Sequence, residues 1–444
     1  MTRAGEVPDM SLDRSLGVGV GLFMTVMLAA FSAAQAGFGF LWSGGHRRHL
    51  PPHRDPRTIH KYTNEGLEGL RKFGDQSADE LIRAHIASAN VGGNPGAPPP
   101  LPGTASVAQI AAVGAFYQTL LDHKYFDIVD HGGKPYTKAL TDWSSTIAFN
   151  HPVDKDSLMR AGQFFKRNLF KIMIILSTSS LLEAYACAKG VQVLSRTGYL
   201  SKDTNRRLKE TLQFVMYVNE PDAFHAVKGK GLAAIRKVRL MHAAIRWLIR
   251  ERGRGEWDQT QTPINGEDLL GMLMGFSGVV LRDLPELDVA LTSEDAADHL
   301  YLWNEVGRLL GAGEKWLPAD LGEALALIGA VKSRQQEYSD AGKKMTDALL
   351  AYHAALLGDF YDVGTGAMRR LAGDYICDML GVPDSEYADH SPMRDWVFRV
   401  LLWWGDRLIT FEQLDAKDEI GVAHHYEGYD IPRSLWSVVF PENA

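Results

Sequence analysis

The sequence has few of the residues that define several common protein classes. Its 444 residues include two cysteines, Cys187 and Cys377, and each lies in an apolar stretch with helical character. The sequence therefore has no disulfide framework and no Cys-x-x-Cys metal or redox motif. Lys and Arg number 47 against 54 Asp and Glu, for a net charge of −7. Because nucleic-acid phosphates bind basic surfaces, this balance argues against nucleic acid as a general partner.

Several familiar catalytic motifs are also absent. The sequence has no Walker loop, no His-Glu-x-x-His and no Glu-x-x-His pair of the kind that a di-iron bundle needs. The nearest approach to Gly-x-Ser-x-Gly, at residues 275–278, lacks the required spacing. Residues 229–234 mimic a dinucleotide fingerprint, but Pro221 precedes them and no strand pattern leads in. The common hydrolase and nucleotide-binding classes are therefore not indicated.

Alternating strand patterns are scarce, and helical periodicity dominates instead. Apolar residues make up 45% and charged residues 23%, as is ordinary for a globular protein. Helices of about ten to twenty residues, separated by Gly, Pro or Asp, predict an all-α domain without a repeat of fixed period. The expected helices are 63–89, 110–123, 157–177, 181–194, 205–218, 231–251, 266–280, 293–310, 318–338, 345–358, 367–380 and 393–414.

The amino-terminal segment, residues 1–45, contains a long apolar run. No charged residue occurs from Ser15 to Gly45, which exceeds the ~20 residues that a membrane-spanning helix needs. A single span or anchor is the first interpretation, and the arginines at 47, 48, 54 and 57 would then leave the main domain cytoplasmic. Ala34-Gln-Ala36 resembles a signal-peptidase site, so a cleaved signal and an exported or secreted protein stay open. A buried core helix is the third possibility.

Composition divides the rest of the chain into three parts. Residues 46–104 form a helical extension that ends in a Pro- and Gly-rich linker at 91–103. Residues 105–414 carry the serial helices and form the main domain. Residues 415–444 are a tail with polar and aromatic residues, expected to lie on the surface.

The expected helix at 231–251 combines an imidazole with buried apolar residues. Its apolar residues recur at three-, four- and seven-residue steps, and His242 lies on their face. Arg239 lies one turn before His242 and Arg246 one turn after it. A neutral imidazole can ligate haem iron, and guanidinium groups can bind the propionate carboxylates of a haem. The alternative is a hydrogen-bonded core histidine beside solvated arginines.

The expected helix at 205–218 offers a second polar group. Arg207 and Thr211 lie one turn apart and share a face with Phe214, so they can polarise a bound diatomic molecule or hold a carboxylate. The alternative is an ordinary helix start with Arg207 in solvent. Upstream, Glu183 lies in an apolar stretch, where it is either a buried acid able to act as a base or a surface residue.

Five motifs together resemble the family of latex clearing proteins (rubber oxygenases) and fungal MpaB-type oxygenases. The similarity extends over residues 140–400 or so. The motifs are Val193-Leu-Ser-Arg-Thr-Gly198, Arg207-Leu-x-Glu-Thr211, Val238-Arg-Leu-Met-His-Ala-Ala-Ile-Arg246, Pro263-Ile-Asn-x-Glu-Asp-Leu269 and a turn at Trp303-x-x-Val-Gly307.

The resemblance implies a globin-like helical fold around haem b, with His242 as the iron ligand. Arg239 and Arg246 would support the haem, Arg207 and Thr211 would face its distal side, and Arg370 would be a further cofactor-binding arginine. Members of the family cleave carbon–carbon double bonds of isoprenoid chains with dioxygen. Glu210 departs from the pattern, because some rubber oxygenases have a distal lysine at this position. The leading apolar segment resembles the membrane-bound MpaB arrangement.

The resulting hypothesis is a haem-dependent oxygenase of the dioxygenase type. Its partners would be dioxygen and a long apolar, isoprenoid-like substrate, and Arg207, Thr211 and Glu183 would be its catalytic residues. Apolar helices at 171–194 and 266–280 would line the substrate channel. Two alternatives stay open: a membrane-tethered haem or lipid carrier without catalysis, and a helical scaffold without a cofactor.

Overall fold

The computed structural model describes residues 49–88, 138–196, 204–226, 229–252, 257–258, 260–389 and 392–408. Within these ranges the chain is helical and forms no strand, apart from one isolated antiparallel bridge between Cys187 and Gln336. The predicted all-α fold is therefore confirmed. The apolar segment 1–45, the linker at 91–103, the expected helix at 110–123 and the tail 415–444 lie outside the described residues.

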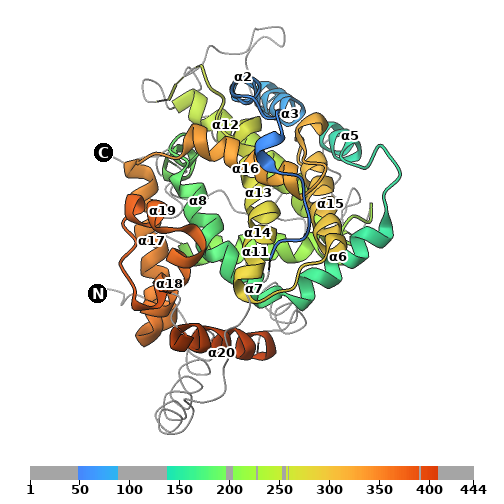
Figure 1. The fold of residues 1–444 in the computed structure, drawn as a ribbon. Coiled ribbons are helices and arrows are strands. Elements are labelled where there is room, and N and C mark those ends of the chain that lie inside the picture. The colour runs from blue at the N-terminus through green and yellow to red at the C-terminus, as the bar shows by residue number, and fades with distance from the viewer. Residues whose placement is uncertain are drawn as a thin grey trace, which may run out of the picture.

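The helices fall into groups in Figure 1, where α13 and α14 occupy the middle, α17 to α19 one side and α6 and α15 the other. The longer ones are α2 (Asn64–Leu70), α3 (Gln76–Ser88), α5 (Lys138–Thr146), α6 (Lys155–Arg167), α7 (Leu169–Ile175), α8 (Leu181–Ala186), α9 (Val191–Arg196), α11 (Thr204–Val218), α12 (Lys230–Arg252), α13 (Gly266–Phe276), α14 (Gly278–Asp283), α15 (Ser293–Leu309), α16 (Leu321–Gln335), α17 (Asp340–Leu357), α18 (Tyr361–Ala372), α19 (Asp374–Leu380) and α20 (Pro392–Leu408). Short turns of helix are η1 (Pro56–Thr58), the π-helical η2 (Leu176–Ser180), η3 (Leu284–Leu287), η4 (Glu314–Trp316), η5 (Gly358–Phe360) and η6 (Glu386–Ala388).

Several expected helices are two helices in the structure. The region 157–177 breaks at Asn168, whose side-chain amide donates to the Phe164 carbonyl and ends α6. The region 266–280 breaks at Ser277 between α13 and α14. Gly373 separates α18 from α19 with a φ of 86°, a conformation that favours glycine. Apolar periodicity continues across each of these breaks, so it did not mark them.

Helix α12 packs against three other helices. It contacts α3, α11 and α15, and most of its residues are buried. Gly231 allows α11 to approach its first turn, because a Cβ there would lie 2.9 Å from the Tyr217 carbonyl oxygen. Other helices therefore cover most of the surface of α12.

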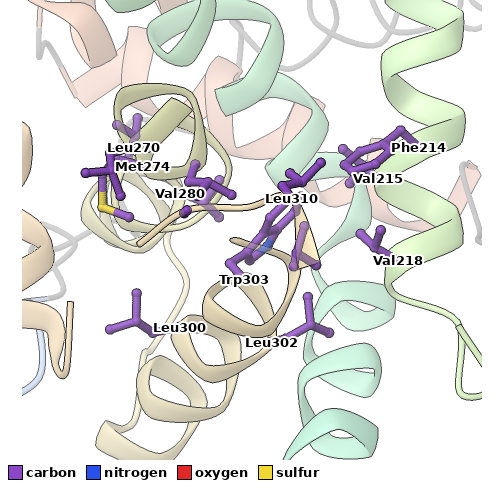
Figure 2. Packing of buried hydrophobic residues seen from close by; sticks show 14 of the residues in the cluster. Phe214, Val215, Val218, Leu270, Met274, Val280, Leu300, Leu302, Trp303 and Leu310 are labelled. Atoms are coloured by element: carbon purple, nitrogen blue, oxygen red, sulfur yellow. The ribbon is translucent and has the colours of Figure 1, made fainter. Parts of the chain in front are cut away.

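The main hydrophobic core gathers side chains from α11, α13, α14 and α15, as Figure 2 shows. Trp303, its largest fully buried side chain, stacks on Phe276 with ring centroids 4.9 Å apart. Trp303 and Gly307 lie within α15, so the turn expected at this motif is wrong. Gly307 instead permits close packing, because a Cβ there would lie 2.9 Å from Leu273 Cδ1.

One apolar stretch runs through α7, η2 and α8. Among the described residues, Leu169–Ala186 is long and apolar enough to cross a membrane, and 56% of it is buried inside the protein. Its position in the middle of the chain and its burial are those of a core helix. This stretch is distinct from the predicted amino-terminal span.

Both cysteines are free thiols in the interior. Cys187 is half-buried between α8 and α9, and Cys377 is fully buried in α19. Burial raises the pKa of each thiol to about 12. Neither cysteine is therefore a thiolate near neutral pH.

Candidate functional site

His242 lies on the one stripe of α12 that keeps accessible surface near the middle of the helix. From Gly231 to Arg246 the half-buried residues are Val238, Met241, His242 and Ile245, and the remaining residues are buried. Their spacing of three, four and seven residues places them side by side on one face. This face, called the His242 stripe below, is apolar except for the imidazole.

The imidazole of His242 is strongly desolvated although it keeps accessible surface. Burial lowers its pKa to about 3, and the positive charges of Arg246 and Arg207 add to the effect against an opposing contribution from Asp75. No hydrogen bond or ion pair of the described residues involves its ring nitrogens. His242 is thus a neutral imidazole with lone-pair capacity that the described chain does not use.

Arg239 is committed to an ion pair within the protein. Its Nε and Nη2 donate to the two carboxylate oxygens of Asp75 at 2.6 and 2.8 Å. Its Nη2 also donates to Ser77 Oγ and its Nη1 to the Leu309 carbonyl. The guanidinium lies over the Trp143 ring. Arg239 therefore fastens α12 to the start of α3 and to the end of α15.

Arg246 uses only part of its hydrogen-bonding capacity within the protein. Its Nε donates to Asp79 at 2.8 Å and its Nη1 to the Ile264 carbonyl at 3.3 Å. Its Nη2 is buried and has no hydrogen-bond partner. A buried donor without an acceptor is costly, so this nitrogen is available to an oxygen atom supplied by a ligand.

The sequence reasoning missed Asp75 and Asp79, which neutralise these two arginines. Asp79 lies in the first turn of α3 and Asp75 immediately precedes this helix, so the two carboxylates are one turn apart on the same face. Burial raises the pKa of Asp75, but the hydrogen bond and charge of Arg239 outweigh it and leave that pKa lowered. The four-residue spacing of the two acids was the available signal.

Arg207 and Thr211 lie on α11, which packs along α12. Both side chains are half-buried, and the charge of Arg207 is near enough to lower the pKa of His242. The structure thus brings Arg207 into the neighbourhood of the imidazole, on the helix that the sequence predicted. Glu210 is half-buried on the same helix.

Glu183 occupies a buried ion cluster. Its Oε1 lies 2.8 Å from Arg282 Nη2 and 3.1 Å from Lys332 Nζ. Arg282 also pairs with Asp283, which accepts a hydrogen bond from Ser179. Glu183 is thus held by two cations of the protein itself, and these contacts favour a structural role.

Arg370 lies in a different part of the protein from the contacts of α12. Its guanidinium donates to Asp395 at 2.7 Å and to the carbonyls of Tyr387 and Asp389. It also lies over the Phe398 ring. Arg370 thus joins α18 to η6 and α20, and no described contact links it to His242.

The Pro263–Leu269 motif organises a buried charge network rather than a reactive centre. Asn265 caps α13 by accepting a hydrogen bond from the Asp268 backbone. Glu267, which is fully buried, pairs with Arg71 at 3.1 Å and with Arg334 at 2.8 Å. The network ties the end of α2 to α13 and α16.

Clustered metal ligands and a surface hollow are two other kinds of site to compare with the His242 stripe. No group of three or more His, Cys, Asp or Glu side chains suited to a metal ion occurs there. A surface hollow of about 770 Å³ lies elsewhere, between residues 51–54, the start of α6 and the amino-terminal turns of α15 and α16. None of the residues predicted to be catalytic or cofactor-binding lines this hollow.

Comparison with known families defines the class to which this fold belongs. Residues 171–406, more than half of the chain, match the family described as ER-bound oxygenase mpaB/B'/Rubber oxygenase, catalytic domain. The chain therefore belongs to this family. The matched residues include α11, α12 and the His242 stripe.

Individual relatives agree with this assignment. The rubber oxygenase of Streptomyces sp. (strain K30) is 26% identical over 237 residues, which are 52% of this chain and 56% of the relative. The chain thus spans about half the length of this curated relative. The solved structure of latex clearing protein LCP in the closed state superposes with a TM-score of 0.58 at 19% identity, covering 80% of this chain and 86% of the other. It has the same all-α fold.

Proposed function

We propose that the protein is a haem b-dependent oxygenase that cleaves carbon–carbon double bonds in a long, isoprenoid-like substrate. Family membership supports oxygenase chemistry, and the rubber oxygenase relative supports a polyisoprene-like substrate. We assign the activity to residues 105–414. The observation that carries the cofactor proposal is the His242 stripe.

We infer that the stripe faces a space enclosed by the chain. His242 keeps accessible surface while the chain around it desolvates the imidazole and lowers its pKa to about 3. An enclosed, apolar space beside an unpaired neutral imidazole suits a porphyrin. The residues present therefore fit the cofactor.

The polar groups around His242 have separate roles in this proposal. His242 would hold the haem iron through its imidazole, and the unpartnered Nη2 of Arg246 would donate a hydrogen bond to a propionate carboxylate. Arg239 acts indirectly by holding α12 against α3. We do not assign a cofactor contact to Arg370, because its donors are used within α18, η6 and α20.

Bound haem would supply the iron that activates dioxygen. Arg207 and Thr211 would donate hydrogen bonds to the polar end of the reacting molecule, in a chamber where few waters compete. Val238, Met241 and Ile245 would exclude water and align the hydrocarbon. The apolar helices predicted to line a channel do pack together, since α13 contacts α8 and η2.

The proposal is tested by replacing His242 with alanine and measuring the visible spectrum of the purified protein. We expect the Soret band to be lost or strongly shifted, and oxygen uptake with an isoprenoid substrate to fall by at least about a hundredfold. Added imidazole should restore part of the band. His353→Ala is the matched control, because His353 is also a buried histidine with a pKa lowered to about 4 but lies on α17.

The outcomes separate the competing functions. If His242→Ala and the wild type share one haem spectrum, the ligand assignment is wrong. If the wild type binds haem but takes up no oxygen with any isoprenoid, the chain is a carrier rather than an oxygenase. Membrane association through the amino-terminal segment remains a prediction, checked by flotation of the full chain with lipid vesicles.

A further inference from the structure

Lys237 carries a buried amine that the protein does not pair. It lies on α12 with 8% of its surface exposed, and it is the one lysine that is buried among the described residues. No hydrogen bond or ion pair of the described chain involves its Nζ atom. Because a buried charge without a partner is costly, a position that served packing alone would favour an apolar side chain.

The other buried cations of the described ranges provide the comparison. They are the arginines at positions 71, 236, 239, 246 and 369. Four of them pair with carboxylates, and Arg236 donates its Nη2 to the Ile147 carbonyl at 3.2 Å. Within these ranges every buried arginine thus has an acceptor, and the buried lysine does not.

The His242 stripe lies on the side of α12 that α11 approaches. A Cβ on Gly231 would lie 2.9 Å from the carbonyl oxygen of Tyr217, near the end of α11. Val238 and Ile245 follow Gly231 by seven and fourteen residues, so they lie on the same side of the helix. The stripe therefore follows the contact between α11 and α12.

Lys237 lies at the edge of this stripe. It precedes Met241 by one turn and Val238 directly, and both of these side chains belong to the stripe and keep accessible surface. Although the residue is buried, its Nζ atom is not fully enclosed. The amine nitrogen therefore reaches free space beside apolar side chains.

The environment of Lys237 favours the neutral amine. Burial lowers its pKa to about 8, and no neighbouring charge contributes, so α3, α11 and α15 bring no carboxylate to it. A lysine in this state is partly neutral near neutral pH, and a neutral amine is a nucleophile. Its common electrophilic partner in proteins is a carbonyl carbon.

We propose that Lys237 is a covalent binding site for an apolar aldehyde or ketone, which it holds as an imine beside the His242 stripe. The amine nitrogen attacks the carbonyl carbon, a C=N bond replaces the C=O bond, and the oxygen leaves as water with the two amine hydrogens. The step is reversible and needs no oxidant or reductant. For its ligand the inference rests on the proposed function, because oxidative cleavage of a carbon–carbon double bond leaves carbonyl ends.

The first test treats the wild-type apoprotein with hexanal and cyanoborohydride, which reduces an imine to a stable amine. Peptide mass spectrometry then locates the adducts. At pH 7.5 we expect Lys237 to be labelled at least about tenfold faster than Lys332, because its lowered pKa leaves far more neutral amine than an ordinary lysine has. Lys332 is the matched control, since it is partly exposed and pairs with Glu183. Labelling of Lys332 without labelling of Lys237 would overturn the proposal.

The second test compares hexanal with glyceraldehyde, which is polar. The ratio of the two labelling rates should be at least about fivefold higher at Lys237 than at Lys332, because Val238 and Met241 favour an apolar chain. Equal ratios at the two lysines would show that the amine opens to water instead of an apolar space. That result would also overturn the proposal.

Both tests work without haem, so they separate this inference from the proposed function. If Lys237 is labelled in a protein that takes up no oxygen with any isoprenoid, the amine site stands and the oxygenase fails. In an active enzyme, cyanoborohydride added during turnover should trap the product on Lys237. Lys237→Arg should give no such adduct, because its guanidinium keeps the charge and forms no imine. Oxygen uptake without a Lys237 adduct would overturn the product as the ligand while the proposed function stands.

Discussion

Two adjoining faces of α12, which meet along the row of Arg239, His242 and Arg246, differ in how completely the protein satisfies them. On one face, Arg239 pairs with Asp75 and Arg246 pairs with Asp79. Each arginine also donates a hydrogen bond from its Nη1 to a backbone carbonyl oxygen. On the other, the His242 stripe presents an imidazole without a partner among apolar side chains. The first face is nearly complete without a ligand and serves the fold. The second is incomplete and can serve binding.

The difference shows that the role of a buried arginine or histidine depends on which of its nitrogens are already hydrogen-bonded within the protein. From the sequence, Arg239, His242 and Arg246 form one constellation on one face of a helix. In the structure a carboxylate consumes most of the donor capacity of Arg239, while Arg246 keeps one free nitrogen. The two arginines therefore differ in what they can offer to a cofactor.

The largest effect on the paired face is expected from Asp75→Asn. This change leaves the Arg239 guanidinium buried without its counter-charge, and we expect the free energy of unfolding to fall by about 3–5 kcal/mol. Denaturant unfolding of the apoprotein measures the loss. A change below about 1 kcal/mol would mean that the α3–α12 contact does not depend on this pair.

Replacement of each arginine by lysine should affect haem affinity at one position and stability at the other. In Arg246→Lys the ammonium can still pair with Asp79 but loses the free Nη2, so haem affinity should fall about tenfold. In Arg239→Lys the stability should fall while haem affinity changes by less than about twofold. The rate of haem transfer to excess apomyoglobin measures haem dissociation, which should become faster as the affinity falls. Equal haem loss from both variants would contradict the distinction.

The unpaired face should make apoprotein stability depend on pH. The pKa of His242 is lowered from 6.5 to about 3, so below pH 6.5 the unfolded chain binds a proton that the folded chain does not. Stability is therefore lost as pH falls from about 6.5 toward 3, by at most about 1.4 kcal/mol per pH unit for one group. His299 and His353, with pKa values lowered to about 4, act in the same direction.

Denaturant midpoints at pH 7.5 and pH 5.5 check this dependence. The difference between the two midpoints should shrink in His242→Gln, because glutamine takes up no proton in either state. If the difference between the two midpoints is unchanged in His242→Gln, the other buried histidines cause the pH dependence.

The smallest effect is expected where an ion pair faces water. Asp347 pairs with Lys343 on the exposed side of α17, with both side chains more than a third exposed. Asp347→Asn should alter stability by no more than about 0.5 kcal/mol, because solvent screens the pair. Measured by the same denaturant unfolding, Asp347→Asn is the exposed control for the buried change Asp75→Asn.

Local pattern was sufficient to predict the two helices on which the site depends. The expected ranges 205–218 and 231–251 agree with α11 and α12 to within one residue at each end. His242 was identifiable because a polar ring interrupts an apolar face, a property of neighbouring residues. Its role as an iron ligand, like those of Arg207 and Thr211, stays a prediction.

What the sequence could not provide depends on contacts between distant residues. The partners Asp75 and Arg239 are 164 positions apart, and Glu183 and Lys332 are 149 apart. No helical period encodes such pairs, so Glu183 could be seen only as a buried or exposed acid. The break at Asn168 likewise results from one side-chain hydrogen bond within an otherwise continuous apolar pattern.

The enclosed thiols have a practical consequence. Since Cys187 and Cys377 are shielded and resist ionisation, alkylating and maleimide reagents should modify the native chain slowly. A single cysteine introduced at an exposed position, such as Tyr375 on α19, would then be the preferred point for a fluorophore or spin label. The wild-type background is thus suited to following motion in solution without prior removal of its own sulfhydryls.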